Sequence, residues 1–495
     1  MGEFAMKSAT RLAEDIREGR ISSSELLELY IKRIERFNPR INAVVARDLE
    51  RAREKATAAD DAVKKGEFAG PLHGLPITIK DTIEVKGMPC TSGSPLLKGH
   101  MPSRHADVVQ SLVDAGAIVF GKTNVPLFGS DLQSFNDVYG TTNNPWDPKR
   151  TPGGSSGGAA AALSAGLCGL EMGSDIGGSI RTPSHFCGLY GHKPSFGIVP
   201  DRGHVPPPPG IFTGHHSMVI DLVTVGPLAR SIDDIALVMD LAVGPEKAEK
   251  KAWRIDLPAP RKDTLSEYKI GCWFDDPACP VDSRVGAVLQ RAVNDLSAHG
   301  AHIIERRPDI DFTGTYDVFL SLLAAVMGSG APSSLFDKWL DEAKELAFDD
   351  QSYMAKNIRG ATQLHNSWIR VDVVRQVIRQ KWHEFFREFD ALVCPVACVP
   401  AVCHDHGHVY GRTIDVNGDR RPYLDLMGWA SLASVAYLPA TVAPVGRTAD
   451  GLPVGIQIIG PYLEDRTPMH IAKLMEDVTG GFVPPPGYEN GSEDE

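Results

Sequence analysis

The fold is decided by residues 151–183, which read TPGGSSGGAAAALSAGLCGLEMGSDIGGSIRTP. Turns rich in glycine and serine stand at both ends of this stretch, one around Ser155 and one around Ser179. Between them, the small residues 157–165 predict a closely packed helix, and the apolar residues 167–172 predict a short buried strand. Helices and strands that alternate between such turns are typical of α/β proteins.

The same alternation extends through most of the chain. The run Ser22-Ser23-Ser24-Glu25 is a capping pattern that predicts the start of a helix, because apolar side chains then recur at helical spacing up to Phe37. Further helices are predicted over 48–65, 108–114, 285–299 and 368–389, and further strands over 75–80, 117–120, 268–274, 302–305 and 391–394. This order predicts an α/β fold with a largely buried sheet.

The 495 residues divide into three parts on these patterns. Residues 1–70 are predicted to be N-terminal helices that pack on a main domain over 71–488, and helices within 316–389 are expected to cap it. The acidic tail 489–495 is predicted to be disordered. The uncharged stretch 426–446 is long enough to raise the question of a membrane span. Serine and proline interrupt it, so we interpret it as a buried helix followed by a core strand.

Composition excludes several classes of protein. The formal net charge is -12 and no run rich in lysine or arginine stands out, which argues against a general nucleic-acid-binding role. With 42% hydrophobic and 23% charged residues the chain is typical of a globular enzyme. The eight cysteines form no C-x-x-C pair and the first residues show no signal peptide, so reduced thiols and a cytoplasmic location are predicted.

One lysine stands at the end of an apolar run, in Gly74-Leu-Pro-Ile-Thr-Ile-Lys80-Asp81. Such a lysine either extends to solvent or is buried. Burial would lower the pKa of its amine and leave a neutral group that can act as a base.

The two glycine-rich turns offer complementary chemistry. Gly153-x-Ser155-x-Gly157 fits a phosphate-binding turn, a nucleophile elbow or a simple glycine turn, although it lacks the Gly-Lys-Ser/Thr ending of a P-loop. In Asp175-Ile-Gly-Gly-Ser179-Ile-Arg181, two glycines before a serine allow adjacent N–H groups to point at one oxygen, as an oxyanion hole requires. Arg181 is close enough in sequence to brace Asp175.

Taken together, these three segments resemble the amidase signature family in order and in spacing. Supporting phrases are GKTNVP at 121–126 and GLPVGIQIIGP at 451–461, and the resemblance runs from about residue 8 to about residue 478. It implies a large, mixed, twisted β-sheet core covered by helices on both faces.

The resemblance also implies roles for individual residues. Ser179 is expected to be the nucleophile, Ser155 a proton relay after a cis peptide bond from Gly154, and Lys80 the base. The expected oxyanion hole consists of the N–H groups of Ile176, Gly177, Gly178 and Ser179, and the expected supports of the loop are Ser156, Ser174, Asp175 and Arg181. No metal or organic cofactor is implied.

The substrate is less well defined by the sequence. Leu127 stands where many relatives carry Glu, and the candidate pocket residues are Leu127, Phe128, Phe135, Tyr139 and Trp429. We expect a small-molecule amide with an apolar or aryl group, with carbamate or ester hydrolysis as the nearer alternative. The enzyme is expected to act as a monomer or homodimer, without nucleic acid or membrane.

Three further alternatives remain. The family also contains the glutaminase subunit of a tRNA-dependent amidotransferase, although the segment 206–216 does not resemble that subunit's usual sequence. A nucleophile elbow on Ser155 would make the protein an ordinary α/β-hydrolase. The cluster Cys394, Cys398, Cys403, His404, His406 and His408 invites a zinc hypothesis, but its spacing fits no standard zinc site, so packing is the favoured interpretation.

Overall fold

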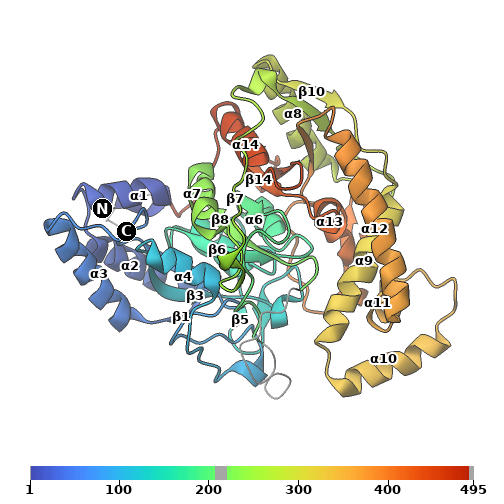
Figure 1. Ribbon diagram of the computed structural model, residues 1–495, viewed down its shortest axis with the longest axis horizontal. Helices are drawn as coiled ribbons and strands as arrows, with labels where there is room; N and C mark the ends of the chain where they lie inside the picture. The colour runs from blue at the N-terminus through green and yellow to red at the C-terminus, as the bar shows by residue number, and fades with distance from the viewer. Residues whose placement is uncertain (1, 207–219, 490–495) are drawn as a thin grey trace.

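The computed structural model describes residues 2–206 and 220–489, and its centre is one mixed sheet of 11 strands (Figure 1). The strands of this sheet are β1 Val44–Arg47, β2 Pro76–Lys80, β3 Ile118–Thr123, β6 Glu171–Asp175, β7 Tyr190–Lys193, β8 Thr224–Ala229, β9 Lys269–Cys272, β10 His302–Glu305, β11 Ala391–Pro395, β14 Ala440–Arg447 and β15 Pro453–Ile459. Two short hairpins lie outside it, β4 Phe135–Asn136 with β5 Gly140–Thr141 and β12 Thr413–Val416 with β13 Asp419–Pro422.

Spatial order in the sheet is β1-β3-β2-β6-β8-β7-β14-β15-β11-β9-β10. Strands β3, β2 and β6 run parallel to one another, β9 runs parallel to both β11 and β10, and the pairs from β6 to β11 through the middle are antiparallel. Every residue of β2, β3, β6 and β15 is buried, as near-continuous apolar or small-residue runs require of strands covered on both faces.

Helices pack against this sheet and against one another. The helices are α1 Ala9–Arg17, α2 Ser23–Ile41, α3 Leu49–Lys64, α4 Asp107–Asp114, α5 Gly157–Ser164, α6 Arg181–Cys187, α7 Ile232–Ala242, α8 Ser283–Ala298, α9 Phe312–Ser329, α10 Ser333–Glu345, α11 Tyr353–Ala361, α12 His365–Phe385, α13 Gly428–Val435 and α14 Arg466–Thr479. Helices α5 and α6 contact each other and the central strands, whereas α14 contacts α7, α8 and β14. The predicted α/β class, with a large mixed sheet between helices, is confirmed.

Local signals located most elements correctly. Ser22 caps α2 and forms the reciprocal capping box with Glu25 that the sequence indicates. The stretch 426–446 becomes the buried helix α13 followed by β14, as expected. The strand predicted over 167–172 lies later, at β6, because the chain after α5 first turns through Gly166, whose φ is +65°. The edge strand β1, within the predicted N-terminal helices, was not anticipated.

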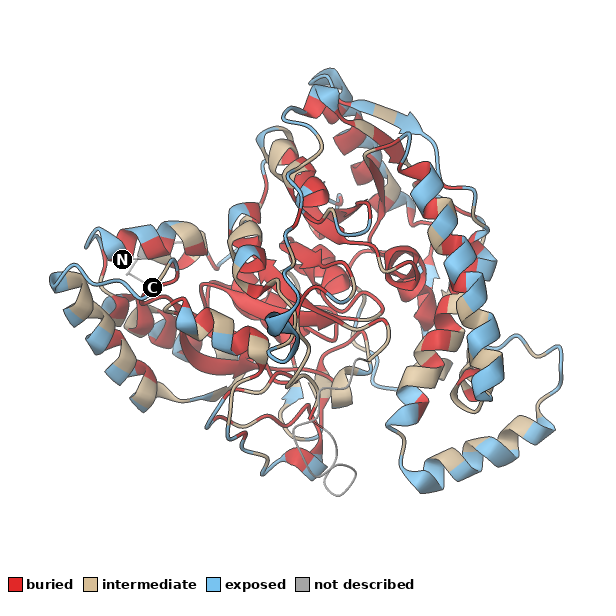
Figure 2. Ribbon diagram, in the orientation of Figure 1, coloured by how far each residue is buried: buried red, intermediate tan, exposed pale blue. Residues whose placement is uncertain are grey.

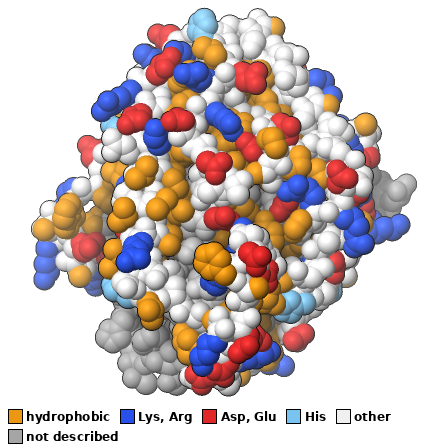
Figure 3. All heavy atoms as spheres, turned by 90° about the vertical axis from the view of Figure 1, so that its right-hand side faces the viewer, with side chains coloured by type: hydrophobic (Ala, Val, Ile, Leu, Met, Phe, Trp, Pro, Cys, Tyr) orange, Lys and Arg blue, Asp and Glu red, His pale blue; other side chains and the backbone are white. Residues whose placement is uncertain are grey.

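Helices α9 to α12, residues 312–385, form a separate layer that we call the helical cover. It lies on the right-hand side of Figure 1, where α10 stands farthest from the sheet. Figure 2 shows the sheet as the buried centre and these helices as largely exposed or intermediate, and α10 has no buried residue. Figure 3 views this side and shows apolar side chains among charged ones. Apolar residues of the cover that are exposed to solvent include Leu364, Val373 and Val377.

Among the described residues, one helix is long and apolar enough to cross a membrane by composition alone, namely α9, Phe312–Ser329. It packs against α11, α12 and α13. Phe319 and Leu322 on it are fully buried. These contacts are typical of a helix inside a folded protein.

Candidate active site

Lys80 ends β2 and is completely buried. It pairs with Thr123 of β3, and the loop before α5 covers its side chain. Its Nζ lies 2.6 Å from Oγ of Ser155, 2.9 Å from Oγ of Ser156 and 2.9 Å from Oγ of Ser174. The structure therefore brings together the lysine of one predicted segment and serines of the other two.

Ser155 stands in a turn that only small residues can build. The peptide bond between Gly154 and Ser155 is cis, as expected. At Gly158, the second residue of α5, an added Cβ would lie 2.3 Å from the backbone nitrogen of Asn124. This close approach explains why the start of α5 consists of glycine and alanine, and it brings α5 against the end of β3.

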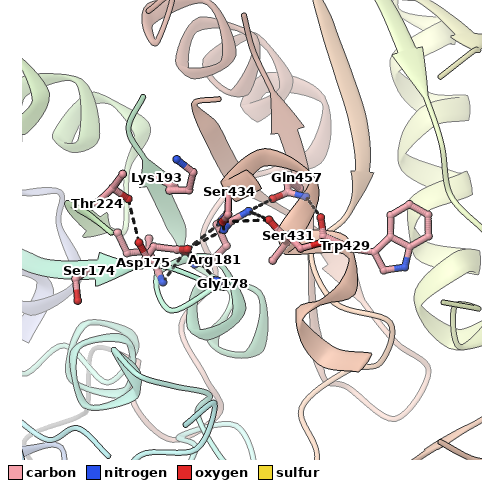
Figure 4. Close-up of polar contacts among 12 residues, drawn as sticks. Ser174, Asp175, Gly178, Arg181, Lys193, Thr224, Trp429, Ser431, Ser434 and Gln457 are labelled. Carbon is pink, nitrogen blue, oxygen red and sulfur yellow. Dashed lines mark hydrogen bonds and ion pairs between the residues drawn. The ribbon is translucent and has the colours of Figure 1, made fainter. Parts of the chain in front are cut away.

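Asp175 and Arg181 organise the loop that carries Ser179 (Figure 4). Arg181 donates from Nη2 to Oδ1 of Asp175 at 2.7 Å and from Nε to Oδ2 at 3.0 Å, and both side chains are fully buried. The guanidinium also donates to the carbonyl of Ala430 at 2.6 Å and to Oε1 of Gln457 at 2.7 Å. The loop is thus anchored to α13 and β15, which lie far away in sequence.

The turn expected to form an oxyanion hole is present, with one of its four N–H groups already engaged. Gly178 donates its N–H to Oδ1 of Asp175 at 2.8 Å. Within residues 2–206 and 220–489, no hydrogen bond engages the N–H groups of Ile176, Gly177 or Ser179. The carboxylate of Asp175 therefore shapes the turn, and three of the four N–H groups predicted to form the oxyanion hole are without a partner among the described residues.

Burial sets the charges of this centre. The desolvation of Nζ lowers the pKa of Lys80 to about 7, although the nearby carboxylates of Asp175 and Glu171 act in the opposite direction. Burial by itself would raise the pKa of Asp175, but the charge and hydrogen bonds of Arg181 outweigh it and hold this pKa at about 2. Near neutral pH, Asp175 is therefore ionised and Lys80 exchanges its proton readily.

A cavity of about 500 Å³ opens beside these groups. Ser155, Ser174 and Ser179 line its floor together with Asp175, and the helical cover forms much of its remaining wall. Cover residues in the wall include Leu320, Leu323, Ala324, Met327, Leu335, Trp339, Tyr353, Lys356 and Asn357. The cavity is therefore mainly apolar, with its polar groups gathered at one end.

The predicted pocket residues are divided by the structure. Leu127 and Phe128 line the cavity. Phe135 stacks on His406 instead, Tyr139 lies outside the lining, and Trp429 is buried against other aromatic rings. Large aromatic side chains pack in protein cores as well as in binding sites, so their presence alone does not mark a pocket.

The cysteine and histidine cluster is dispersed. Cys394 accepts a hydrogen bond from Gln457, Cys398 contacts the carbonyl of Asp425, and Cys403 is exposed. The part of the chain that the structure describes contains no group of three or more residues suited to a metal ion. Apart from Pro206, the segment 206–216 lies outside the described residues.

Two functional candidates escaped the sequence analysis. His204 lines the cavity and its Nε2 lies 2.8 Å from Oγ of Ser174. Glu171, at the start of β6, is fully buried, and burial raises its pKa to about 7. Both stand outside any recognisable motif, so only the fold brings them to Lys80.

A family model for amidases matches residues 25–468, a range that includes Lys80, Ser155, Ser179 and the helical cover. The chain belongs to the amidase family. The family and the enzyme class expected from the sequence, an amide hydrolase, are thereby confirmed.

Individual relatives include amidotransferase subunits and several solved structures. A glutamyl-tRNA(Gln) amidotransferase subunit of Anaeromyxobacter sp. (strain K) is 32% identical over 489 residues, which cover 94% of this chain and 95% of that protein. A solved vestigial complex related to the origins of an s-triazine catabolic enzyme, with inhibitor bound, has 28% identity, a TM-score of 0.79 and coverage of 96% and 99%. A bacterial aryl acylamidase has 25% identity, a TM-score of 0.77 and coverage of 96% of each chain.

Proposed function

We propose that this enzyme hydrolyses an uncharged carboxamide bearing an apolar or aryl group, through an acyl-enzyme on Ser179. The observation that carries the proposal is the 2.6 Å contact between Nζ of buried Lys80 and Oγ of Ser155, in the wall of a cavity that Ser179 also lines. A serine hydroxyl is a poor nucleophile until a neighbouring base takes its proton. A buried amine next to a serine meets that requirement.

Acylation uses the three side chains in order. Neutral Lys80 takes the proton of Ser155, which takes the proton of Ser179 as its Oγ forms a bond to the substrate carbonyl carbon. The N–H groups of Ile176, Gly177 and Ser179, which have no partner among the described residues, stabilise the negative oxygen that develops. Lys80 then returns the proton through Ser155 to the nitrogen, the C–N bond breaks and the amine leaves.

Deacylation repeats the sequence with water. Ser155 and Lys80 accept a proton from the attacking water, whose oxygen bonds to the acyl carbon. The bond to Oγ of Ser179 breaks, and the proton returns to that oxygen. The acid is released and the enzyme regains its starting state, so no cofactor enters this scheme.

The charges around the cavity support an uncharged substrate. Among its described lining residues, Asp175 is paired with Arg181, Asp131 with Arg412, and Lys356 with Asp317. A charged substrate would therefore find no unpaired charge of opposite sign among these residues. Removing its charged group from water would cost roughly several kcal/mol. Apolar cover residues instead favour an apolar or aryl group.

Carbamates and esters are the nearer alternative substrates. The same nucleophile and oxyanion turn attack any of the three carbonyl groups, and esters need less help from the acid because an alkoxide leaves more easily than an amide anion. The aryl acylamidase among the structural relatives favours the amide.

An amidotransferase component is the second candidate function, because relatives about 30% identical carry that name. Glutamine has an ammonium and a carboxylate group, and the charged residues of the described lining are already paired and so offer neither group a partner. A requirement for a partner chain is therefore one outcome of the experiment below. A monomer or homodimer in the cytoplasm remains our expectation.

The test compares a matched anilide, aryl carbamate, aryl ester and glutamine as substrates for wild type, Ser179→Ala and Lys80→Met. We expect wild type to cleave the anilide and both variants to lose about 10³-fold or more in kcat while remaining folded. Ser111→Ala, on α4 and outside the cavity lining, is the matched serine control and keeps full activity.

Mass spectrometry of the enzyme with the slow aryl carbamate should find one added acyl group, on Ser179. A folded Ser179→Ala enzyme that retains activity would contradict the proposal. Activity on glutamine alone, or only with a co-purified partner, would favour the amidotransferase.

A further inference from the structure

His204 ends a chain of hydrogen bonds that begins at Lys80. Nζ of Lys80 lies 2.9 Å from Oγ of Ser174, and that oxygen lies 2.8 Å from Nε2 of His204. An isolated antiparallel bridge to Ile83, just beyond β2, holds the backbone of His204. We propose that His204 is a positioning residue, which fixes the hydroxyl of Ser174 so that the lone pair of Lys80 is directed at Ser155.

The need for such a residue follows from a count of hydrogens. Three hydroxyl groups surround Nζ of Lys80, those of Ser155, Ser156 and Ser174, at 2.6 to 2.9 Å. A protonated amine donates to all three, but a neutral amine has two N–H groups and one lone pair. Only one hydroxyl can donate to that lone pair. Catalysis requires it to be Ser155, which lines the cavity beside Ser179.

Ser156 and Ser174 must therefore direct their own hydrogens elsewhere. Oγ of Ser156 lies 3.4 Å from the backbone carbonyl of Ser174, which can accept its hydrogen. The hydroxyl of Ser174 has Nε2 of His204 as its remaining described partner. In the proposed arrangement, protonated Lys80 donates to Ser174 and Ser174 donates to Nε2, which requires the imidazole to carry its hydrogen on Nδ1.

The surroundings of His204 suit this role. Burial and the neighbouring charge of Lys80 lower the pKa of His204 to about 3, so its ring is neutral and Nε2 can accept. Nδ1 is shielded from solvent and has no hydrogen-bond partner among the described residues. The orientation of the ring thus depends on the bond to Ser174.

Without the acceptor on His204, the hydroxyl of Ser174 turns to donate into the lone pair of Lys80. The neutral amine is then stabilised in an unproductive arrangement, so kcat falls and the pKa of Lys80 falls with it. The other ionisable groups that act on Lys80 are Asp175 and Glu171 of β6. Both remain in place, so the shift is assigned to Ser174.

The inference rests on the proposed role of Lys80 as base, and its test compares His204→Leu with His204→Gln across pH 5 to 9. We expect His204→Leu to lower kcat about tenfold, the effect of one hydrogen bond at most, with KM nearly unchanged. The midpoint of the acid limb should move to lower pH. His204→Gln keeps an acceptor oxygen and should recover most of kcat and the original midpoint.

A double-mutant cycle with Ser174→Ala separates positioning from other roles. In the Ser174→Ala background, His204→Leu should change kcat less than about twofold, since its target hydroxyl is gone. A full tenfold loss in that background, or an effect on KM alone, would overturn the inference in favour of substrate contact. Wild-type kinetics in His204→Leu would also overturn it.

The Ser179→Ala and Lys80→Met enzymes keep this result separate from the proposed function. If both are inactive while His204→Leu behaves like wild type, the positioning role fails and the proposed mechanism stands. If either is active, the proposed mechanism fails before His204 is considered. Thermal unfolding of each variant verifies that it is folded.

Discussion

The loop around Asp175 and the helical cover line the same cavity and are built in different ways. In the loop, Arg181 is fully buried and its donors are taken up by a carboxylate, a carbonyl, an amide and a hydroxyl. In the cover, α10 has no buried residue and Phe348 is 99% exposed. The predicted catalytic loop is therefore held by a buried polar network, whereas the cover has many exposed side chains. We expect substitutions to be tolerated poorly in the loop and well in the cover.

The largest effect should come from breaking the polar network. Arg181→Met leaves the carboxylate of Asp175 buried without its partner, which we expect to lower the free energy of unfolding by about 3–5 kcal/mol and to abolish activity. Urea unfolding and anilide hydrolysis measure the two effects. Arg466→Met removes an exposed ion pair with Asp240 and should change stability by less than about 1 kcal/mol. Equal losses in both variants would refute the contrast.

The charge state of the network provides the second prediction. The pKa of Lys80 is lowered to about 7, so the amine is protonated, and unable to accept a proton, below that pH. With chemistry rate-limiting, kcat at pH 6 should be about a tenth of its value above pH 8.

Glu171→Gln is the control for this profile, because the pKa of Glu171 is also raised to about 7. The variant removes a carboxylate that raises the pKa of Lys80. The acid limb should therefore persist and move to lower pH. A limb that disappears in Glu171→Gln would assign the titration to the glutamate instead.

Changes in the cover should be smaller and should affect binding. Trp339 of α10 lines the cavity but is only partly buried. Trp339→Ala is expected to raise KM for a bulky anilide about fivefold, the loss of roughly 1 kcal/mol of apolar contact, without changing kcat. Steady-state kinetics with bulky and small amides test it; equal effects on both amides would argue against a role in the wall.

The smallest effect is expected at the most exposed apolar residue of the cover. Phe348→Ser should leave the free energy of unfolding within about 0.5 kcal/mol of wild type and leave KM unchanged. Paired with Trp339→Ala, it separates contact with substrate from a general disturbance of the cover. A marked loss of stability would mean that Phe348 is covered by another surface in solution.

The sequence predicts those parts of the site that consist of short, continuous motifs. Lys80 at the end of an apolar strand, the turn at Ser155 and the loop from Asp175 to Arg181 were all identified, since each needs a special local backbone or a special charge. The edge strand β1 was missed because four residues carry too little periodicity. The strand β6 begins late because of the turn at Gly166, and it continues to Asp175 through Gly173, which packs closely against Leu228 of β8 and Ser156.

Contacts between segments that are far apart in the chain could not be predicted from the sequence. Phe135, Tyr139 and Trp429 were reasonable pocket candidates, yet Trp429 packs on Trp273 and Phe312. His204 stands alone in a loop, and its neighbours become visible only when that loop returns to β2. The engagement of Gly178 by Asp175 likewise depends on the folded turn.

Arg181 is synthesised long before the residues that anchor it. Its partners Ala430 and Gln457 follow it by 249 and 276 residues, so the ribosome delivers them last. At about 5–20 residues per second, the loop waits on the order of tens of seconds for the groups that lock it. We therefore expect a nascent chain that already contains Lys80, Ser155 and Ser179 to stay inactive until Ala430 and Gln457 have been made.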